Sequence, residues 1–182
     1  MTRRGTLYLV VGPSGAGKDT LIAAARQVLA DDPGWVFPQR VIDRPGSDDT
    51  ERHVPVSTAR IHQMQSDGAF ALSWRAHGHH YGIPTSAIDA LATGRNVVVN
   101  VSRAVIADAA AQFPPVHVIE IAAPENVRAT RLAARQRELA TDQQQRLARP
   151  DPAVPHGPPR TVVLNDGALD EAINLFLRAL RT

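Results

Sequence analysis

The segment Gly12-Pro-Ser-Gly-Ala-Gly-Lys18 has the residue types and the spacing of a phosphate-binding loop, G-x-x-x-x-G-K. Glycines let backbone N–H groups turn toward an anion, and a helix that begins after such a loop adds its own N-terminal N–H groups. Lys18 would then reach the β- and γ-phosphates of a nucleotide. A glycine-rich turn that only ends a strand is the alternative, but the lysine and the flanking strand and helix favour a nucleotide site. The loop residues expected to bind the nucleotide are Gly12, Ser14, Gly15, Ala16, Gly17 and Lys18.

The residues after Lys18 depart from the usual pattern. Asp19 stands where a Ser or Thr normally contacts Mg²⁺, and Thr20 follows it. A carboxylate is a suitable ligand for this hard cation, so Asp19 is a candidate to bind Mg²⁺ directly or through water. The same negative charge would also stabilise the N-terminus of a helix, and both interpretations stay open. The acidic residue that usually ends a second strand is replaced by Asn100. Asp19 and Thr20 are both counted with the nucleotide-binding residues.

Short apolar runs alternate with segments of helical period along the chain. Strands are expected at residues 7–11, 35–37, 69–74, 96–101, 116–121 and 161–164. Helices are expected at 21–29, 57–64, 85–92 and 103–112, from 124 to beyond 137, and at 169–180. Residues 75–84 and 150–159 are expected to be loops. This order predicts a three-layer α/β domain with a mainly parallel sheet.

Composition and charge exclude several classes of protein. The 20 basic and 18 acidic side chains give a net charge of only +2, and no run of five like charges occurs, so no nucleic-acid partner is expected. The absence of cysteine excludes disulfides, thiolate metal sites and cysteine nucleophiles. The first apolar run is too short for a membrane span or a signal segment, so no membrane partner is expected. We therefore expect a cytoplasmic protein, and the sequence does not indicate its oligomeric state.

Several spaced motifs occur in one order along the chain. They are Gly12–Lys18, Arg44-Pro45, Phe70, His77-Gly78-x-x-Tyr81-Gly82-x-Pro84, a strand through Val99, Arg131-Leu132-x-x-Arg135-x-Arg137-Glu138 and Val163-Leu164-Asn165-Asp166. With these motifs the chain resembles the guanylate kinase branch of the nucleoside monophosphate kinases over nearly its whole length. The resemblance implies a single P-loop kinase domain over residues 1–182 with the three-layer nucleoside-monophosphate-kinase-like fold. It also implies an acceptor-binding insertion at about 38–86 and a lid at about 131–149.

The base-binding part of a guanylate kinase is missing from this sequence. Where that family has a Glu that contacts guanine, the chain has Leu72, and where it has a Ser or Thr after Tyr-Gly, the chain has Ile83. The two aspartates that follow the third strand are replaced by Asn100 and Ser102. A guanine donor that faces Leu72 or Ile83 would lack a partner, at a cost of roughly 1–3 kcal/mol for each group. Guanine binding is therefore expected to be lost.

The altered positions match another family. Its motifs appear here as Gly12-Pro-Ser-Gly-Ala-Gly-Lys-Asp-Thr20, Leu72-Ser73-Trp74-x-Ala76-x-Gly78-x-x-Tyr81-Gly82, Val97-Val98-Val99-Asn100-x-Ser102-Arg103 and Arg146-Leu147-Ala148-Arg149. The chain closely resembles the ribose 1,5-bisphosphate phosphokinases, in which Asp19 and Asn100 are ordinary. The resemblance implies that ATP, with Mg²⁺, phosphorylates a small-molecule substrate, ribose 1,5-bisphosphate, on its 1-phosphate. The product would be 5-phospho-α-D-ribose 1-diphosphate (PRPP), in the degradation of phosphonates.

The resemblance also implies roles for individual residues. Lys18 would hold the ATP phosphates, and Arg131, Arg135 and Arg137 would act from the lid on the transferring group, although Arg146 and Arg149 are further candidates. Asn165 would border the adenine. Arg40, which stands where guanylate kinases usually have a serine, would bind the acceptor phosphate with Arg44 and Tyr81. Asn100, Ser102 and Arg103 would complete the acceptor site, and Arg103 is expected to reach the ribose or its second phosphate.

Other functions stay open at this point. One is a guanylate kinase or another small-metabolite P-loop kinase, and another is a non-catalytic guanylate-kinase-like module, against which Lys18 argues. A hydroxyl acceptor would require a general base, for which Asp43 is the candidate. His77, His79 and His80 suggest a metal site, but no carboxylate lies close to them in the sequence.

Overall fold

The protein is described by a computed structural model that covers residues 4–44, 52–134 and 154–182. The expected lid therefore lies outside the described residues except for its first part. Arg135, Arg137, Arg146 and Arg149 belong to the segment that is not described, so their expected roles stay predictions.

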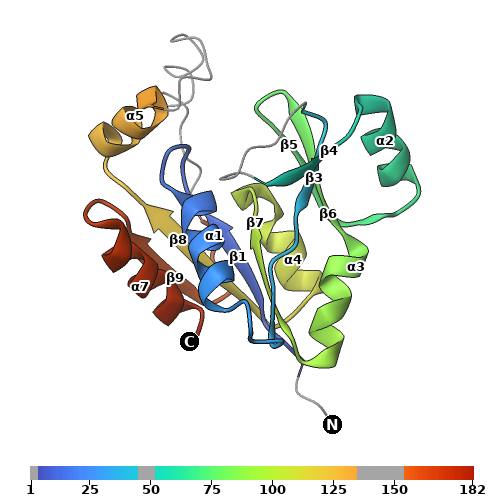
Figure 1. The fold of residues 1–182 in the computed structure, drawn as a ribbon. Helices are drawn as coiled ribbons and strands as arrows, with labels where there is room; N and C mark the ends of the chain where they lie inside the picture. Colours follow the sequence, from blue (N-terminus) through green and yellow to red (C-terminus); the bar gives the residue numbers. More distant parts are fainter. Residues whose placement is uncertain (1–3, 45–51, 135–153) are drawn as a thin grey trace.

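The core sheet has five parallel strands in the order β2-β7-β1-β8-β9 (Figure 1). The central strand β1 is buried along its whole length, as a continuous apolar run predicts. All five strands lie where the sequence predicted strands. Their bounds are β1 Leu7–Val11, β2 Trp35–Val36, β7 Asn96–Asn100, β8 Val116–Ala122 and β9 Arg160–Leu164.

Helices cover one face of this sheet, and further helices with a second sheet cover the other face. Tyr8 and Val10 of β1 belong to the core cluster formed with α1 (Lys18–Val28) and α7 (Leu169–Ala179). Leu7 and Leu9 belong to the opposite cluster, formed with the 3-10 helix η1 (Asp89–Thr93), the α4 helix (Ile106–Gln112) and the second sheet. Because side chains alternate along a strand, one sheet serves both cores. This is the three-layer arrangement that the sequence predicted.

The second sheet has four strands in the order β4-β3-β6-β5. Only the pair β3 and β4 is parallel, whereas β3 with β6 and β5 with β6 are antiparallel. The sheet falls within the range 38–86 that was expected for the acceptor-binding insertion. Its strands and neighbouring helices are β3 Arg40–Ile42, β4 His53–Pro55, α2 Thr58–Ser66, β5 Phe70–Ala76, β6 His79–Pro84 and α3 Thr85–Ile88.

The prediction of a loop at residues 75–84 is wrong. β5 continues to Ala76, a tight turn at His77 and Gly78 has positive φ angles of 53° and 76°, and β6 follows directly. The cross-strand pair of Trp74 with Tyr81 explains the difference, because the two buried rings stack at a centroid distance of 5.3 Å. Pairing between strands therefore outweighs the weak strand propensity of this His-, Gly- and Pro-containing segment.

Two further elements complete the described chain. The predicted helix at 103–112 begins with a 3-10 turn, η2 (Arg103–Val105), and the helix α5 covers Glu125–Ala134. Among the described residues, no helix has both the length and the apolar character required to cross a membrane.

Candidate active site

The P-loop joins β1 to α1 and is held in place by close backbone approaches. Gly12 has φ 143°, and a Cβ on it would overlap the carbonyl oxygen of Ile121 in β8. Gly17 has φ 91°, and a Cβ on it would overlap the side-chain amide of Asn165. Glycine is therefore required at both positions for conformation and for space. Together with the N-terminus of α1, this loop has the geometry of an anion site.

Lys18, the only lysine of the chain, lies along this loop. Its Nζ donates hydrogen bonds to the carbonyl oxygens of Gly12 (2.7 Å) and Pro13 (3.0 Å). The ammonium group is thus held over the mouth of the loop, at the N-terminus of α1, where a nucleotide phosphate would lie. Ser14, Gly15 and Thr20 are half-buried around it, and Ala16 is fully buried.

Asp19 connects the P-loop helix to both sheets. Its Oδ1 accepts a hydrogen bond from the side-chain amide of Asn100 at the end of β7 (2.7 Å). The same oxygen accepts from Nη2 of Arg40 at the start of β3 (3.2 Å). The structure therefore brings three predicted site residues together from distant parts of the chain. A carboxylate oxygen suits Mg²⁺, so Asp19 fits this cation as a ligand, with the nucleotide-binding candidate Thr20 next to it in the sequence.

Arg40 also contacts the aromatic pair of the second sheet. Its guanidinium carbon lies 5.9 Å from the centroid of the Tyr81 ring, which also stacks on Trp74. Arg44 follows the same strand, and the imidazole Nε2 of His53 lies 3.3 Å from its carbonyl oxygen. The packed ring of Tyr81 thus fixes the position of Arg40 beside the P-loop helix.

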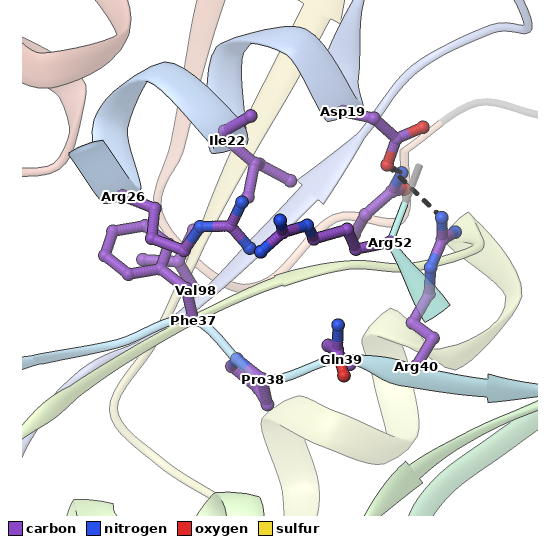
Figure 2. A pocket seen from close by; sticks show the side chains of 11 residues that line it. Asp19, Ile22, Arg26, Phe37, Pro38, Gln39, Arg40, Arg52 and Val98 are labelled. Atoms are coloured by element: carbon purple, nitrogen blue, oxygen red, sulfur yellow. Dashed lines mark hydrogen bonds and ion pairs between the residues drawn. The ribbon is translucent and has the colours of Figure 1, made fainter. Parts of the chain in front are cut away.

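An open cleft lies between α1 and the segment that leads into β3 (Figure 2). Asp19, Arg40 and Asn100 form one part of its lining. Arg26 and Arg52 also line it, and neither residue was predicted from the sequence to belong to the site. The spacing of Asp19 and Arg26, seven residues apart and so on one face of α1, is the signal that could have identified Arg26.

Asn165 and Arg131 support the P-loop from the other side. The buried Asn165 donates its side-chain amide to the carbonyl oxygen of Ala16 (2.8 Å). Arg131 donates to the backbone oxygen of Asn165 (3.0 Å) and to its Oδ1 (3.2 Å). Arg131, on α5, is therefore tied to the loop through one asparagine.

Ser102 and Arg103 have contacts of a different kind. The Ser102 hydroxyl accepts from the backbone N–H of Ala104 (3.3 Å) and so caps η2. The buried guanidinium of Arg103 donates to Glu120 of β8 (2.8 Å), and Glu120 also pairs with Arg160. Side chains alternate between the two faces of a strand, so Glu120 lies on the same face of β8 as Val116 and Val118. These two valines belong to the core cluster on the sheet face opposite α1.

Asp43 lies in a polar cluster between β3, β6 and α2. Its carboxylate accepts from the backbone N–H (2.7 Å) and the ring Nδ1 (2.8 Å) of His80 and from the Thr58 hydroxyl (3.3 Å), and His79 lies 3.4 Å away. Burial by itself raises the pKa of Asp43, but the interactions with His80 and Thr58 lower it below its usual value. A carboxylate does lie next to these histidines in space, yet no group of three or more potential ligands among the described residues is arranged to hold a metal ion.

The sequence of the chain is similar to those of several kinases. It is 54% identical over 149 residues to the ribose 1,5-bisphosphate phosphokinase of Acidiphilium cryptum. The aligned residues cover 82% of this chain and 79% of that protein. It is 45% identical over 177 residues to the enzyme of the same name from Methylobacterium radiotolerans. The aligned residues cover 97% of this chain and 98% of that protein. The bifunctional ribose 1,5-bisphosphokinase-thymidine phosphorylase of Cupriavidus pinatubonensis is 44% identical over 181 residues. The chain spans only 30% of the length of that bifunctional relative.

The fold is shared with solved kinase structures. A guanylate kinase from Anaplasma phagocytophilum superposes with a TM-score of 0.69 at 15% identity, over 99% of this chain and 86% of that chain. A gluconokinase from Sinorhizobium meliloti 1021 gives a TM-score of 0.52 at 18% identity, over 100% and 94%. No protein-family model matches the sequence. The predicted guanylate-kinase-like fold is confirmed, and by its relatives the chain belongs to the ribose 1,5-bisphosphate phosphokinase family.

Proposed function

We propose that the chain transfers the γ-phosphoryl group of ATP to the 1-phosphate of ribose 1,5-bisphosphate and forms 5-phospho-α-D-ribose 1-diphosphate in phosphonate degradation. The observation that carries the proposal is the contact of Arg40 with Asp19 at 3.2 Å, because it joins the second sheet directly to the P-loop helix. A guanidinium at that place suits a phosphate acceptor. Two relatives of this chain are named ribose 1,5-bisphosphate phosphokinase, and these names support the proposed reaction.

Each part of the site has a role in this reaction. An oxygen of the acceptor 1-phosphate forms a bond to the γ-phosphorus of ATP while the bond to the β–γ bridging oxygen breaks and ADP leaves. Lys18 and the loop amides hold the ATP phosphates, and Arg40, Arg44 and Tyr81 hold the acceptor phosphate. Asp19 would hold the Mg²⁺ that accompanies ATP, beside the nucleotide-binding Thr20, and the cation would supply neutralisation of phosphate charge. Arg131, with Arg135 and Arg137, acts on the transferring group.

The environment of Asp43 favours a phosphate acceptor over a hydroxyl acceptor. A hydroxyl group must lose a proton to a general base, whereas a phosphate oxygen is already ionised at neutral pH. The side chain of Asp43, the candidate base, is only 4% exposed and is engaged by His80 and Thr58. Because this carboxylate is enclosed, an acceptor that needs no base agrees best with the site.

The second sheet also argues against guanine as the acceptor base. Leu72 and Ile83 face each other in the β5–β6 pair, and their exposed fractions are 3% and 0%. Both side chains belong to the apolar core cluster that also contains Trp74 and Tyr81. The positions at which guanylate kinases place polar groups for guanine are therefore part of the core in this chain.

The proposal is tested by offering the protein ATP and Mg²⁺ with one of three acceptors: ribose 1,5-bisphosphate, ribose 5-phosphate or GMP. ADP release is followed by a coupled assay, and the phosphorylated product is identified by mass spectrometry. We expect turnover with ribose 1,5-bisphosphate and formation of PRPP. Turnover of GMP alone would contradict the proposal, and no turnover with any acceptor would favour a non-catalytic module.

A further inference from the structure

The cleft next to the P-loop continues along α1 to a pair of arginines. Asp19, Ile22, Ala23 and Arg26 line it at the spacing i, i+3, i+4 and i+7, which places all four side chains on one face of the helix. Arg52 extends into the cleft from the opposite side, so that the side chains of Arg26 and Arg52 point toward one another (Figure 2). The part of the cleft lined by Arg26 and Arg52 is called the arginine end below.

The lining of the cleft carries more positive than negative charge. Its three arginines, Arg26, Arg40 and Arg52, face a single carboxylate, Asp19. That carboxylate pairs with Arg40 and also accepts from Asn100. Within residues 4–44, 52–134 and 154–182, no ion pair joins Arg26 or Arg52 to a carboxylate. Two guanidinium groups that point toward one another repel each other, and an anion between them would offset that repulsion.

The distance between the two ends of the cleft suits an acceptor with two phosphates. Asp19 and Arg26 are seven residues apart on α1, so their backbones are separated by about 10 Å at about 1.5 Å per residue. The phosphates on carbons 1 and 5 of a ribose have a separation of the same order. A phosphate held by Arg40 next to the P-loop would therefore leave the second phosphate near the arginine end. Guanidinium groups bind phosphate oxygens through paired, charge-assisted hydrogen bonds.

We propose that Arg26 and Arg52 bind the 5-phosphate of the acceptor, the phosphate that does not receive the transferred group. This inference rests on the proposed function and adds the residues that select a bisphosphate. From the sequence, Arg103 was expected to reach the ribose or its second phosphate, and in the structure Arg103 donates to Glu120 on the face of the sheet opposite α1. Val98, which lines the cleft, belongs to the α1 face.

The test compares two acceptors in the full-length protein. Ribose 1,5-bisphosphate carries both phosphates, and ribose 1-phosphate lacks only the one assigned to the arginine end. KM and kcat for both acceptors are measured for wild type, for Arg26→Gln and Arg52→Gln, and for the double variant. Arg178→Gln is the matched control, because Arg178 also lies in the last turn of a helix and is exposed but does not line the cleft.

The expected result is a selective loss. The double variant should raise KM for ribose 1,5-bisphosphate roughly 10- to 100-fold with kcat little changed, because charge-assisted hydrogen bonds are lost. Its kcat/KM for ribose 1-phosphate should change by less than about threefold, since that acceptor lacks the phosphate in question. An unchanged KM for the bisphosphate, or an equal loss with both acceptors, would overturn the inference while the proposed function stands.

Calorimetry of the two acceptors, without ATP, separates this inference from the proposed function. If the wild type binds ribose 1,5-bisphosphate but does not phosphorylate it, the proposed function fails, and the calorimetry alone decides the inference. Weaker binding of the bisphosphate to the double variant, with unchanged binding of ribose 1-phosphate, supports the arginine end as a phosphate subsite. Equal affinities in wild type and variant overturn it. If the variants keep their affinity for the acceptor but no longer bind inorganic phosphate in the same calorimetry, the two arginines belong to an effector site. That result would also overturn the inference.

Discussion

Asn165, at the end of β9, donates its side-chain amide to the carbonyl oxygen of Ala16 in the P-loop, at 2.8 Å across 149 residues of sequence. The loop glycine Gly17 lies so close to this amide that a Cβ on it would overlap the nitrogen. Arg131 binds two oxygens of the same asparagine. One buried side chain thus connects the P-loop to the last core strand and to the helix α5.

The first prediction concerns this asparagine. Asn165→Ala should destabilise the protein by about 1–3 kcal/mol, because a buried carbonyl oxygen loses its donor and Arg131 loses one acceptor. The substitution should also weaken ATP binding, since the loop is no longer held from this side. Urea unfolding and ATP calorimetry measure the two effects. Asn126→Ala, at an exposed position on α5, is the control, and equal stabilities of the two variants would contradict the prediction.

The second prediction concerns the only lysine. Lys18→Arg should lower kcat by more than about 100-fold even though the charge is kept. The slim ammonium group fits between the carbonyl oxygens of Gly12 and Pro13, whereas a planar guanidinium group is wider and has a fixed fork geometry. Lys18→Ala should lose at least as much activity. Steady-state kinetics at saturating ATP check both variants, and an Arg variant within tenfold of wild type would show that only the charge matters.

Several parts of this architecture could be predicted from sequence because independent signals agree there. The apolar run of β1, the glycine spacing of the P-loop and the helical period of α1 each point to the same strand, loop and helix. β7 and α7 were predicted for the same reason. The sequence pattern of an element predicts its structure where the apolar side chains of that element alone determine which face is buried.

The missed features depend on neighbours that are distant in the sequence. β6 contains His79, His80, Gly82 and Pro84 and forms a strand because β3 and β5 pair with it on both sides. The contact of Asp43 with His80 follows from the same pairing. Arg26 and Arg52 line one cleft although they are distant in the sequence, and no periodicity within either segment contains that information.

The third prediction distinguishes the two interpretations of Asp19. If Asp19 supports Mg²⁺, Asp19→Ala should raise the Mg²⁺ concentration at half-maximal rate several-fold, and Asp19→Ser should do so less, because a serine hydroxyl is the usual ligand at this position. Initial rates over a Mg²⁺ titration at fixed ATP check this. A higher KM for the acceptor with an unchanged Mg²⁺ dependence would show that Asp19 acts only by holding Arg40 and Asn100.

The fourth prediction is a pH dependence of stability at Asp43. Burial raises the pKa of this carboxyl group, but the interactions with His80 and Thr58 together lower the pKa by more than burial raises it. The pKa of Asp43 therefore lies below its usual value. A group with a lowered pKa contributes stability above the pKa of the unfolded chain, near 3.9. That contribution is lost as the pH falls through the lowered pKa.

Asp43→Asn should therefore cost about 1–3 kcal/mol of unfolding free energy at pH 7, because the His80 N–H and ring lose a charged acceptor. The difference from wild type should shrink as the pH falls below about 4, where the carboxyl group of the unfolded chain takes up its proton, and it should vanish once the pH falls below the lowered pKa of the native carboxyl group. Urea unfolding from pH 7 down to pH 3 measures the difference, with Asp108→Asn as an exposed control on α4. A difference that stays constant over this range would show that the carboxylate charge contributes nothing and that only the shape of the side chain matters.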